Sequence, residues 1–336
     1  MARVAINGLG RIGRATLKIL MDSPELEVVA ANDLVSVENL AYLLDFDTVY
    51  GRYERKVSVG DEALEIDGTT VRMSSEKDPG RLPWSELDVD IVFECTGMFT
   101  DRDGLQKHLD AGARHAILSA PSKGDGVEWV VYGVNEPSDD ARLITCASCT
   151  TNCITPVVEV MDRRIGVDKA TMTTVHAYTS SQALVDGPNK KIRRGRAGAA
   201  NLVPTSTGAA RATTQLLTDL EGRFDGVAVR APVPVGSIAD IVMVTKRETS
   251  LDEVTAVLEN EAASDRYDGI LGAVRDPMVS SDIIGDPRAS VVDIEMTQVV
   301  GGNLVKVMAW YDNEWGYSAQ MVRTARHLAR RTADRS

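Results

Sequence analysis

Residues 2–34 read ARVAINGLGRIGRATLKILMDSPELEVVAANDL, which is the pattern of a strand, a glycine-led turn, an amphipathic helix and a second strand. Gly8, Gly10 and Gly13 form a GxGxxG motif, and Asp33 ends the second strand 20 residues after the last glycine. One glycine makes the tight turn, one lets the backbone approach a pyrophosphate, and one lets the helix pack close to the strand. The stretch therefore predicts a dinucleotide-binding βαβ unit.

The acid at the end of the second strand indicates which dinucleotide is bound. The start of the helix supplies free N–H groups and a positive dipole for phosphates. A carboxylate such as Asp33 binds both hydroxyls of an adenosine ribose and repels a 2′-phosphate, so we expect NAD rather than NADP. If the three glycines only made a tight turn, the position of this acid would be a coincidence.

Three further apolar runs predict that the sheet continues: VDIVFECTG (89–97), HAILSAP (115–121) and ARLITCAS (141–148). Such runs, separated by helical stretches, suit buried strands of a parallel sheet, and ligands on such sheets lie at the carboxyl ends of the strands. We therefore expect an α/β protein with an N-terminal Rossmann domain, built on a doubly wound, mostly parallel sheet.

Composition narrows the class of protein. The 336 residues, 43% of them hydrophobic, suffice for two domains, and four cysteines are too few for a disulfide framework. The net charge of −12 argues against a nucleic-acid or membrane partner, and charges or prolines interrupt every apolar run well short of a membrane span. We expect a soluble cytoplasmic enzyme or binding protein with reduced thiols.

A second stretch, ITCASCTTNC (144–153), contains three of the four cysteines. Ser148 suits the N-cap of a helix, so Cys149 would lie in its first turn, where the helix dipole and free N–H groups lower a thiol pKa below its usual value of ~8.5. Cys153 lies one turn further, in a packed position, and Cys146 lies in the last residues of the preceding strand. Cys149 is therefore the expected nucleophile.

A thiolate nucleophile needs a base, and the chain has four histidines. His176 lies near the end of the apolar strand KATMTTVHAYT, from which it can project toward the Cys149 helix. The others lie in a predicted surface helix (His108), at a strand start (His115) and in the C-terminal helix (His327). A lone histidine at a strand end is usually structural, and the pairing with Cys149 is what favours a catalytic role for His176.

Six motifs, in order along nearly the whole chain, resemble those of the phosphorylating glyceraldehyde-3-phosphate dehydrogenases. They are INGLGRIGR (6–14), ASCTTNC (147–153), TTVHAYT (173–179), RRGRAGA (193–199), PTSTGAA (204–210) and WYDNEWGY (310–317). The resemblance implies an NAD-dependent enzyme of glycolysis or gluconeogenesis that converts D-glyceraldehyde 3-phosphate and inorganic phosphate into 1,3-bisphosphoglycerate. The reaction would pass through a thiohemiacetal and a thioester on Cys149, with His176 as the base and no metal.

The resemblance also assigns ligand roles. It implies that the substrate phosphate is held by Thr179, Arg194 and Arg230, and the attacking phosphate by Ser148, Thr150, Thr207 and Gly208, with Arg230 near both. It places Arg11 and Ile12 at the pyrophosphate, Asn32 and Asp33 at the adenosine, Ser119 near the nicotinamide ribose, Asn313 at the carboxamide and Tyr317 at the wall of the nicotinamide pocket.

Two domains and a homotetramer follow from the same resemblance. Residues 1–148 and 313–336 would form the NAD-binding domain, with the C-terminal helix packed back on it. Residues 149–312 would form an α+β catalytic domain with a mostly antiparallel sheet, and runs such as GVAVRAPVPV, ADIVMVTKRE and NLVKVMAWY suit its strands. The loop of residues 180–203 would lie at a subunit contact.

Three alternatives stay open. The enzyme could be an erythrose-4-phosphate dehydrogenase or a paralogue with a shifted aldehyde-phosphate substrate, which the pair His176 and Thr179 disfavours. Cys146, Cys149 and Cys153 could hold zinc or an iron–sulfur cluster, although a fourth ligand has no evident candidate nearby. The chain could also be a non-catalytic NAD-binding regulator.

Cys146 stands where the family usually has asparagine. For this residue a buried packing role is favoured over a protective disulfide with Cys149.

Overall fold

The computed structural model describes residues 1–334 of the chain, which divides into two compact units. Unit 1 consists of Met1–Tyr132, Glu136–Ala147 and the residues from Ser318 onward, and unit 2 consists of Gly133–Asn135 and Ser148–Tyr317. Residues 335 and 336, which end the predicted NAD-binding domain, lie outside the described residues. No helix within residues 1–334 is long and apolar enough to cross a membrane.

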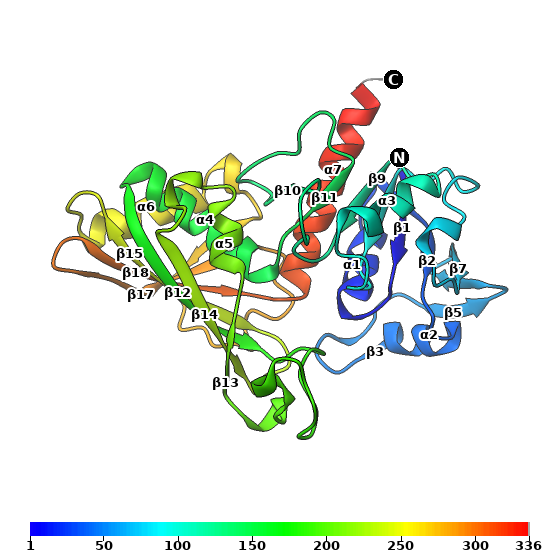
Figure 1. Cartoon of the computed structure of the whole chain (residues 1–336), viewed down its shortest axis with the longest axis horizontal. Helices are drawn as coiled ribbons and strands as arrows, with labels where there is room; N and C mark the ends of the chain where they lie inside the picture. The colour runs from blue at the N-terminus through cyan, green and yellow to red at the C-terminus, as the bar shows by residue number, and fades with distance from the viewer. Residues whose placement is uncertain (335–336) are drawn as a thin grey trace. The chain divides into compact units, whose positions relative to one another are not determined.

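Unit 1 is built on a nine-stranded sheet (Figure 1). In order across the sheet its strands are β10 (Glu128–Trp129), β11 (Leu143–Thr145), β9 (His115–Leu118), β8 (Ile91–Glu94), β1 (Ala2–Asn7), β2 (Leu26–Asn32), β7 (Thr69–Ser74), β6 (Ala63–Ile66) and β5 (Val57–Gly60). Only β6 runs antiparallel to its two neighbours. The predicted Rossmann-type, mostly parallel sheet is therefore confirmed.

The centre of this sheet positions the site. β1 lies between β2 and β8, so the chain order reverses there, and ligands on doubly wound sheets bind beside the carboxyl ends of the strands at such a point. Asn7, Asn32 and Glu94 are the last residues of β1, β2 and β8 and lie in register with one another. Three adjacent strands therefore end in a row of polar side chains.

The helices of unit 1 follow from local sequence signals. Its remaining elements are α1 (Arg11–Met21), α2 (Val37–Asp45), the short strands β3 (Phe46–Asp47) and β4 (Gly51–Arg52), the 3-10 helix η1 (Pro79–Arg81), α3 (Arg102–Asp110) and, from Ser318 onward, α7 (Trp315–Asp334). Helix α1 begins directly after Gly10, and α3 begins after Asp101, whose side chain accepts a hydrogen bond from the N–H of Gly104. Helix α1 thus starts inside the glycine motif, as the sequence predicts.

Helix α7 joins unit 1 from the far end of the sequence. Arg326 donates to the hydroxyl of Ser23 at 2.8 Å, and Arg331 donates to the carbonyl of Pro137 at 2.7 Å. The side chain of Ser318 also donates to the carbonyl of Ile12 at 3.5 Å. The helix is therefore an integral part of the unit that residues 1–147 begin.

One prediction for α3 was wrong. His108 was expected on a surface helix, but its side chain is 0% exposed. Both ring nitrogens have buried partners, Glu94 on β8 and Trp84. A polar helix sequence gave no sign of this, because both partners lie far away along the chain.

Unit 2 is built on a seven-stranded sheet with the order β13 (Val203–Ser206), β14 (Phe224–Ala231), β12 (Val167–Ala177), β15 (Ser237–Thr245), β18 (Leu304–Tyr311), β17 (Ser290–Val300) and β16 (Leu271–Val274). Only the pairs β12 with β14 and β16 with β17 are parallel, which confirms a mostly antiparallel sheet. Helices α4 (Cys149–Arg164), α5 (Ala209–Thr214) and α6 (Leu251–Ala262) cover one face (Figure 1). The 3-10 helices are η2 (Ile192–Gly195), η3 (Gly198–Ala200), η4 (Thr218–Leu220) and η5 (Asp265–Tyr267).

Candidate active site

The first turn of α4 carries the candidate nucleophile. Ser148 is the N-cap, and its hydroxyl accepts a hydrogen bond from the N–H of Thr151 at 3.1 Å. Ala147, immediately before it, has a left-handed φ of 54°, which a non-glycine residue rarely adopts. The N–H of Ala147 donates to the hydroxyl of Thr145 at 3.0 Å and so helps to hold this turn. Cys149 therefore begins α4, as predicted.

His176 lies beside this thiol. Its Nε2 atom is 3.3 Å from Sγ of Cys149, and it comes from the end of β12. Its Nδ1 atom lies 2.7 Å from both the carbonyl oxygen of Ala177 and Nη1 of Arg230. When Nδ1 carries the proton it donates to Ala177, and Nε2 is free to act as a base. In the other tautomer Nδ1 accepts from Arg230, and Nε2 can donate to an oxyanion.

The charge states of the pair differ from the prediction. Burial, followed by the positive charge of Arg230, lowers the pKa of His176 to about 3, so the imidazole is neutral. Burial also raises the pKa of the Cys149 thiol, and the Arg230 guanidinium is the largest opposing influence. The expected lowering of this thiol pKa is therefore wrong. The arrangement is a thiol with a neutral base in contact, in which proton transfer accompanies nucleophilic attack.

A buried tyrosine supports both partners. The hydroxyl of Tyr311 hydrogen-bonds with those of Thr150 at 2.9 Å and Thr174 at 2.8 Å. Its ring meets the ring of His176 edge-on, with centroids 6.0 Å apart. Sequence reasoning assigned Tyr311 no role, although it lies in the quoted motif WYDNEWGY. A tyrosine within a sequence motif gives no indication of which hydroxyl groups its own hydroxyl will contact.

Positively charged groups gather on the other side of His176. Arg194 donates through Nε to the hydroxyl of Thr205 at 3.0 Å and through Nη1 to that of Ser181 at 3.3 Å. Ser181 in turn hydrogen-bonds with Thr179 at 2.8 Å. Burial and the charges of Arg194 and Arg230 lower the pKa of Lys191. The cluster is suited to an anion, because cations this close repel one another until a negative charge lies among them.

One observation, at Arg230, supports an anion among these charges. The buried Nε of Arg230 has no hydrogen-bond partner within residues 1–334. Gly208 is the N-cap of α5 and provides no side-chain cap, while the N–H of Ala209 donates to the hydroxyl of Thr207 at 3.2 Å. A planar guanidinium with an unused donor is well matched to a phosphate oxygen.

Unit 1 contains a cavity of about 560 Å³ at the carboxyl ends of its central strands, lined by residues that include Gly8, Gly10, Asn32, Asp33, Glu76 and Phe99. A Cβ on Gly13 would lie 1.9 Å from the carbonyl oxygen of Gly8, so only glycine fits this close helix–strand contact. A Cβ on Gly10 would meet nothing within 4 Å, which leaves open space beside the backbone. Both observations match the roles predicted for the glycines of a dinucleotide site.

The acid of this cavity is held by backbone groups. The carboxylate of Asp33 accepts hydrogen bonds from the N–H of Leu9 at 2.6 Å and of Val35 at 2.9 Å. Each bond uses one lone pair of a different oxygen, so lone pairs remain for two ribose hydroxyls. The residues of this unit therefore fit an adenosine dinucleotide.

The remaining predicted cofactor residues do not line this cavity. The Arg11 guanidinium pairs with Asp47 at 2.5 Å. Ile12 and Gly13 follow within α1, and Ser119 comes after β9, with its N–H bonded to the carbonyl of Glu94 at 3.0 Å. In unit 2 the side-chain oxygen of Asn313 accepts from Ser237 at 2.9 Å, and Tyr317 is buried.

The other cysteines are packed. Cys146 is 1% exposed, and its sulfur lies 3.8 Å from the hydroxyl of Thr324 on α7. Cys153 contacts Ser290 at 3.6 Å, and burial raises the pKa of both thiols to about 12. None of the four cysteines forms a disulfide, and no group of three or more His, Cys, Asp or Glu side chains in the described part of the chain could hold a metal. Cys146 and Cys153 thus behave as small apolar residues.

Comparisons with family models and with individual known proteins agree with each other. Residues 2–102 match the family model "Glyceraldehyde 3-phosphate dehydrogenase, NAD binding domain", and residues 148–313 match the corresponding C-terminal domain. A glyceraldehyde-3-phosphate dehydrogenase 2 of Streptomyces avermitilis is 45% identical over 95% of this chain and 96% of its own length. A glyceraldehyde-3-phosphate dehydrogenase of Haloarcula vallismortis is 46% identical over 97% and 98%, and glyceraldehyde-3-phosphate dehydrogenase 1 of Bacillus subtilis is 44% identical over 98% of each chain.

Proposed function

The chain belongs to the glyceraldehyde-3-phosphate dehydrogenase family, and from this premise we propose that Cys149 is its nucleophile and His176 its base. It is an NAD-dependent oxidoreductase that converts glyceraldehyde 3-phosphate into 1,3-bisphosphoglycerate. The observation that carries the assignment of residues is the 3.3 Å contact between Sγ and Nε2 at the start of α4. We further propose that unit 1 is the NAD-binding domain and unit 2 the catalytic domain.

The residues of unit 2 account for the proton and acyl steps. Sγ of Cys149 attacks the aldehyde carbon while Nε2 of His176 takes the thiol proton. Nε2 then passes this proton to the former carbonyl oxygen, which gives a hemithioacetal and leaves His176 neutral again. His176 then accepts the proton of the hemithioacetal hydroxyl as the carbon is oxidised. NAD, when bound, supplies the hydride acceptor that makes this oxidation possible. Inorganic phosphate attacks the resulting thioester, and the thiolate of Cys149 leaves.

The positive charges of Arg194 and Arg230, with the hydroxyl groups near them, are suited to bind the two phosphates of the reaction. We assign the substrate phosphate to Arg194, Arg230 and Thr179, in keeping with the unused Nε donor of Arg230. The attacking phosphate goes to the hydroxyls of Ser148, Thr150 and Thr207 and to Gly208. An anion bound there would offset the positive charge that lowers the pKa of His176, so the imidazole becomes more basic as the substrate binds.

A homotetramer in the cytoplasm completes the proposal. The segment 180–203 exposes four large apolar side chains, namely Leu184, Val185, Ile192 and Leu202, with exposed fractions from 67% to 86%. Apolar side chains gathered on one segment are typical of a subunit contact. Four cysteines that form no disulfide agree with a reducing compartment.

The reaction is tested by following NADH formation from glyceraldehyde 3-phosphate with and without inorganic phosphate. We expect steady turnover with phosphate, and without it a burst of about one NADH per Cys149 followed by slow hydrolysis of the thioester. Erythrose 4-phosphate serves as the competing substrate. A higher kcat/KM for that aldehyde, or turnover that does not need phosphate, would contradict the proposal.

Cofactor choice gives a second prediction. Asp33→Asn removes the charge that repels a 2′-phosphate, and its single amide oxygen keeps one of the two backbone hydrogen bonds. Because a like-charge contact is worth at least about 1.4 kcal/mol, the ratio of kcat/KM for NAD over NADP should fall at least about tenfold. The matched control is Asp67→Asn, at an exposed position with a φ of 48° that asparagine tolerates. An unchanged ratio in Asp33→Asn would show that this acid does not face the ribose.

A further inference from the structure

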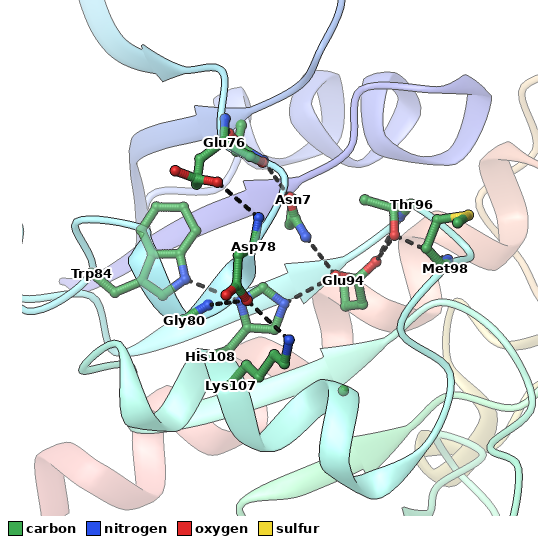
Figure 2. A network of polar contacts seen from close by, with 12 residues as sticks. Asn7, Glu76, Asp78, Gly80, Trp84, Glu94, Thr96, Met98, Lys107 and His108 are labelled. Carbon is green, nitrogen blue, oxygen red and sulfur yellow. Dashed lines mark hydrogen bonds and ion pairs between the residues drawn. The ribbon is translucent and has the colours of Figure 1, made fainter.

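A buried carboxylate lies behind the cofactor cavity of unit 1. Glu94 ends β8 and is 0% exposed. It accepts hydrogen bonds from the amide of Asn7 at 2.6 Å, from Nε2 of His108 at 3.0 Å, and from both the N–H (2.8 Å) and the hydroxyl of Thr96 (Figure 2). A buried carboxylate is costly unless it is fully hydrogen-bonded, and four donors meet that condition.

An indole fixes the orientation of one of these donors. Nε1 of Trp84 donates to Nδ1 of His108 at 3.1 Å, and both side chains are 0% exposed. Indole N–H is a donor only, so Nδ1 must be the unprotonated nitrogen. The proton is therefore on Nε2, where it points at Glu94 (Figure 2). Trp84 thus selects the tautomer that the carboxylate requires.

One branch of the network leads from Glu94 to the adenosine side of the cavity. The side-chain oxygen of Asn7 accepts from Nδ2 of Asn32 at 2.8 Å. The same Nδ2 donates to the carbonyl of Glu76 at 2.9 Å, and the oxygen of Asn32 accepts from the N–H of Glu76 at 2.8 Å. Both amide hydrogens of Asn32 are therefore in use, and the residue has none left for a cofactor.

A second branch leads to the glycine loop. A Cβ on Gly8 would lie 2.8 Å from the backbone nitrogen of Thr96, so Thr96 packs directly on this loop. The N–H of Met98 donates to the hydroxyl of Thr96 at 3.1 Å. The carboxylate that orients Asn7 thus orients the segment after β8 as well, and both segments line the cavity.

The alternative is that the network only stabilises the core. Replacing a buried charge by an apolar group of the same shape often leaves the stability of a core unchanged or increases it. Glu94 and His108 do not line the cavity. The other residues that donate hydrogen bonds to Glu94, Asn7 and Thr96, do line it. The bonds therefore converge on the cofactor-binding edge of the sheet rather than on the core in general.

We propose that Glu94, oriented by His108 and Trp84, positions the residues that line the cofactor cavity. Asn32 then acts on the cofactor by holding the Glu76 segment in place, and not by donating a hydrogen bond to the cofactor. The proposal rests on the NAD-binding function proposed above for unit 1. It predicts that changes at His108, outside the cavity, weaken NAD binding without altering the thiol of unit 2.

The test measures the Kd of NAD by calorimetry on the unliganded protein, together with the rate of Cys149 alkylation by iodoacetamide. His108→Leu removes both ring nitrogens and should raise the Kd about tenfold, because a buried support that loosens shifts the groups it holds. His108→Gln can donate to Glu94 and accept from Trp84, and should restore the Kd to within about threefold of wild type. Alkylation should stay at the wild-type rate in both variants.

The matched control is Tyr267→Phe in unit 2. It removes a comparable buried bond, from the Tyr267 hydroxyl to Glu159 at 2.5 Å, and should lower the Tm while leaving the Kd of NAD unchanged. Hydrogen exchange in the unliganded protein gives a readout independent of the cofactor: the Glu76 amide should exchange faster in His108→Leu and not in Tyr267→Phe. If His108→Leu does not fold, Trp84→Phe gives the same test with a smaller loss.

The outcomes are distinct. Weaker NAD binding in His108→Leu, recovered by glutamine, supports the proposal. The proposal is overturned if the Kd of NAD in His108→Leu stays within twofold of wild type, or if His108→Leu and Tyr267→Phe lose NAD affinity equally. A wild-type protein that binds no NAD overturns the proposed function itself.

Discussion

Replacing Cys149 with alanine is expected to lower kcat by at least about 10⁴-fold, because the covalent route is lost and no other described group replaces the nucleophile. The Kd of NAD should not change, since the cavity of unit 1 does not include this residue. Loss of iodoacetamide labelling at neutral pH would identify the same sulfur by a second measurement.

The control for this result is Cys153→Ala, four residues further along the same helix. Cys153 is 0% exposed and contacts Ser290 and the carbonyl of Ala309, so its removal should lower the Tm slightly and leave kcat within about twofold. A kcat that falls equally in both variants would mean that the start of α4, and not the Cys149 thiol, is what the substitution damages.

The second large effect is expected for His176→Asn, which should lower kcat by about 10²- to 10⁴-fold, the usual contribution of a general base. Asparagine can still donate to an oxyanion but cannot take the thiol proton. Tyr311→Phe provides the comparison, because it removes the neighbouring hydroxyl and keeps the base; its kcat should fall by less than about tenfold. Equal losses in the two variants would contradict a proton-transfer role for His176.

The same substitution should change how stability depends on pH. The folded pKa of His176 is about 3, whereas the unfolded value is about 6.5, so between these values the unfolded chain binds more protons. The contribution of this group is therefore complete above pH 6.5 and is lost as the pH falls toward 3. The Tm of the wild type should decline more steeply than that of His176→Asn over this window, as measured by calorimetry.

Sequence patterns were sufficient to predict the role of a residue wherever that role depends on its neighbours in the chain. The roles of Gly10 and Gly13, the N-cap Ser148 and the first-turn position of Cys149 are local features, and each can be read from spacing. The position of His176 at a strand end was predictable for the same reason. Its distance from the thiol was not, because it depends on how β12 and α4 pack.

What the sequence left out depends on contacts between distant segments. Asn7 and Glu94 are 87 residues apart, and Trp84 and His108 are 24 apart, so no periodicity relates them. The pKa of Cys149 was predicted from the helix start alone, whereas burial, which only the assembled unit reveals, has the larger influence. Asn32 was assigned a cofactor contact by resemblance, and the use of both its amide hydrogens could be seen only in three dimensions.

The membership of α7 in unit 1 has a consequence for biosynthesis. A chain emerges from the ribosome N-terminus first, so Ser148–Tyr317 appears before the part of α7 that packs beside Ser23 and Pro137. The main body of unit 2 is therefore complete before synthesis ends, whereas unit 1, although it starts first, is complete only when α7 has emerged. Until α7 has emerged, Ser23 and Pro137 lack the hydrogen bonds that they accept from this helix.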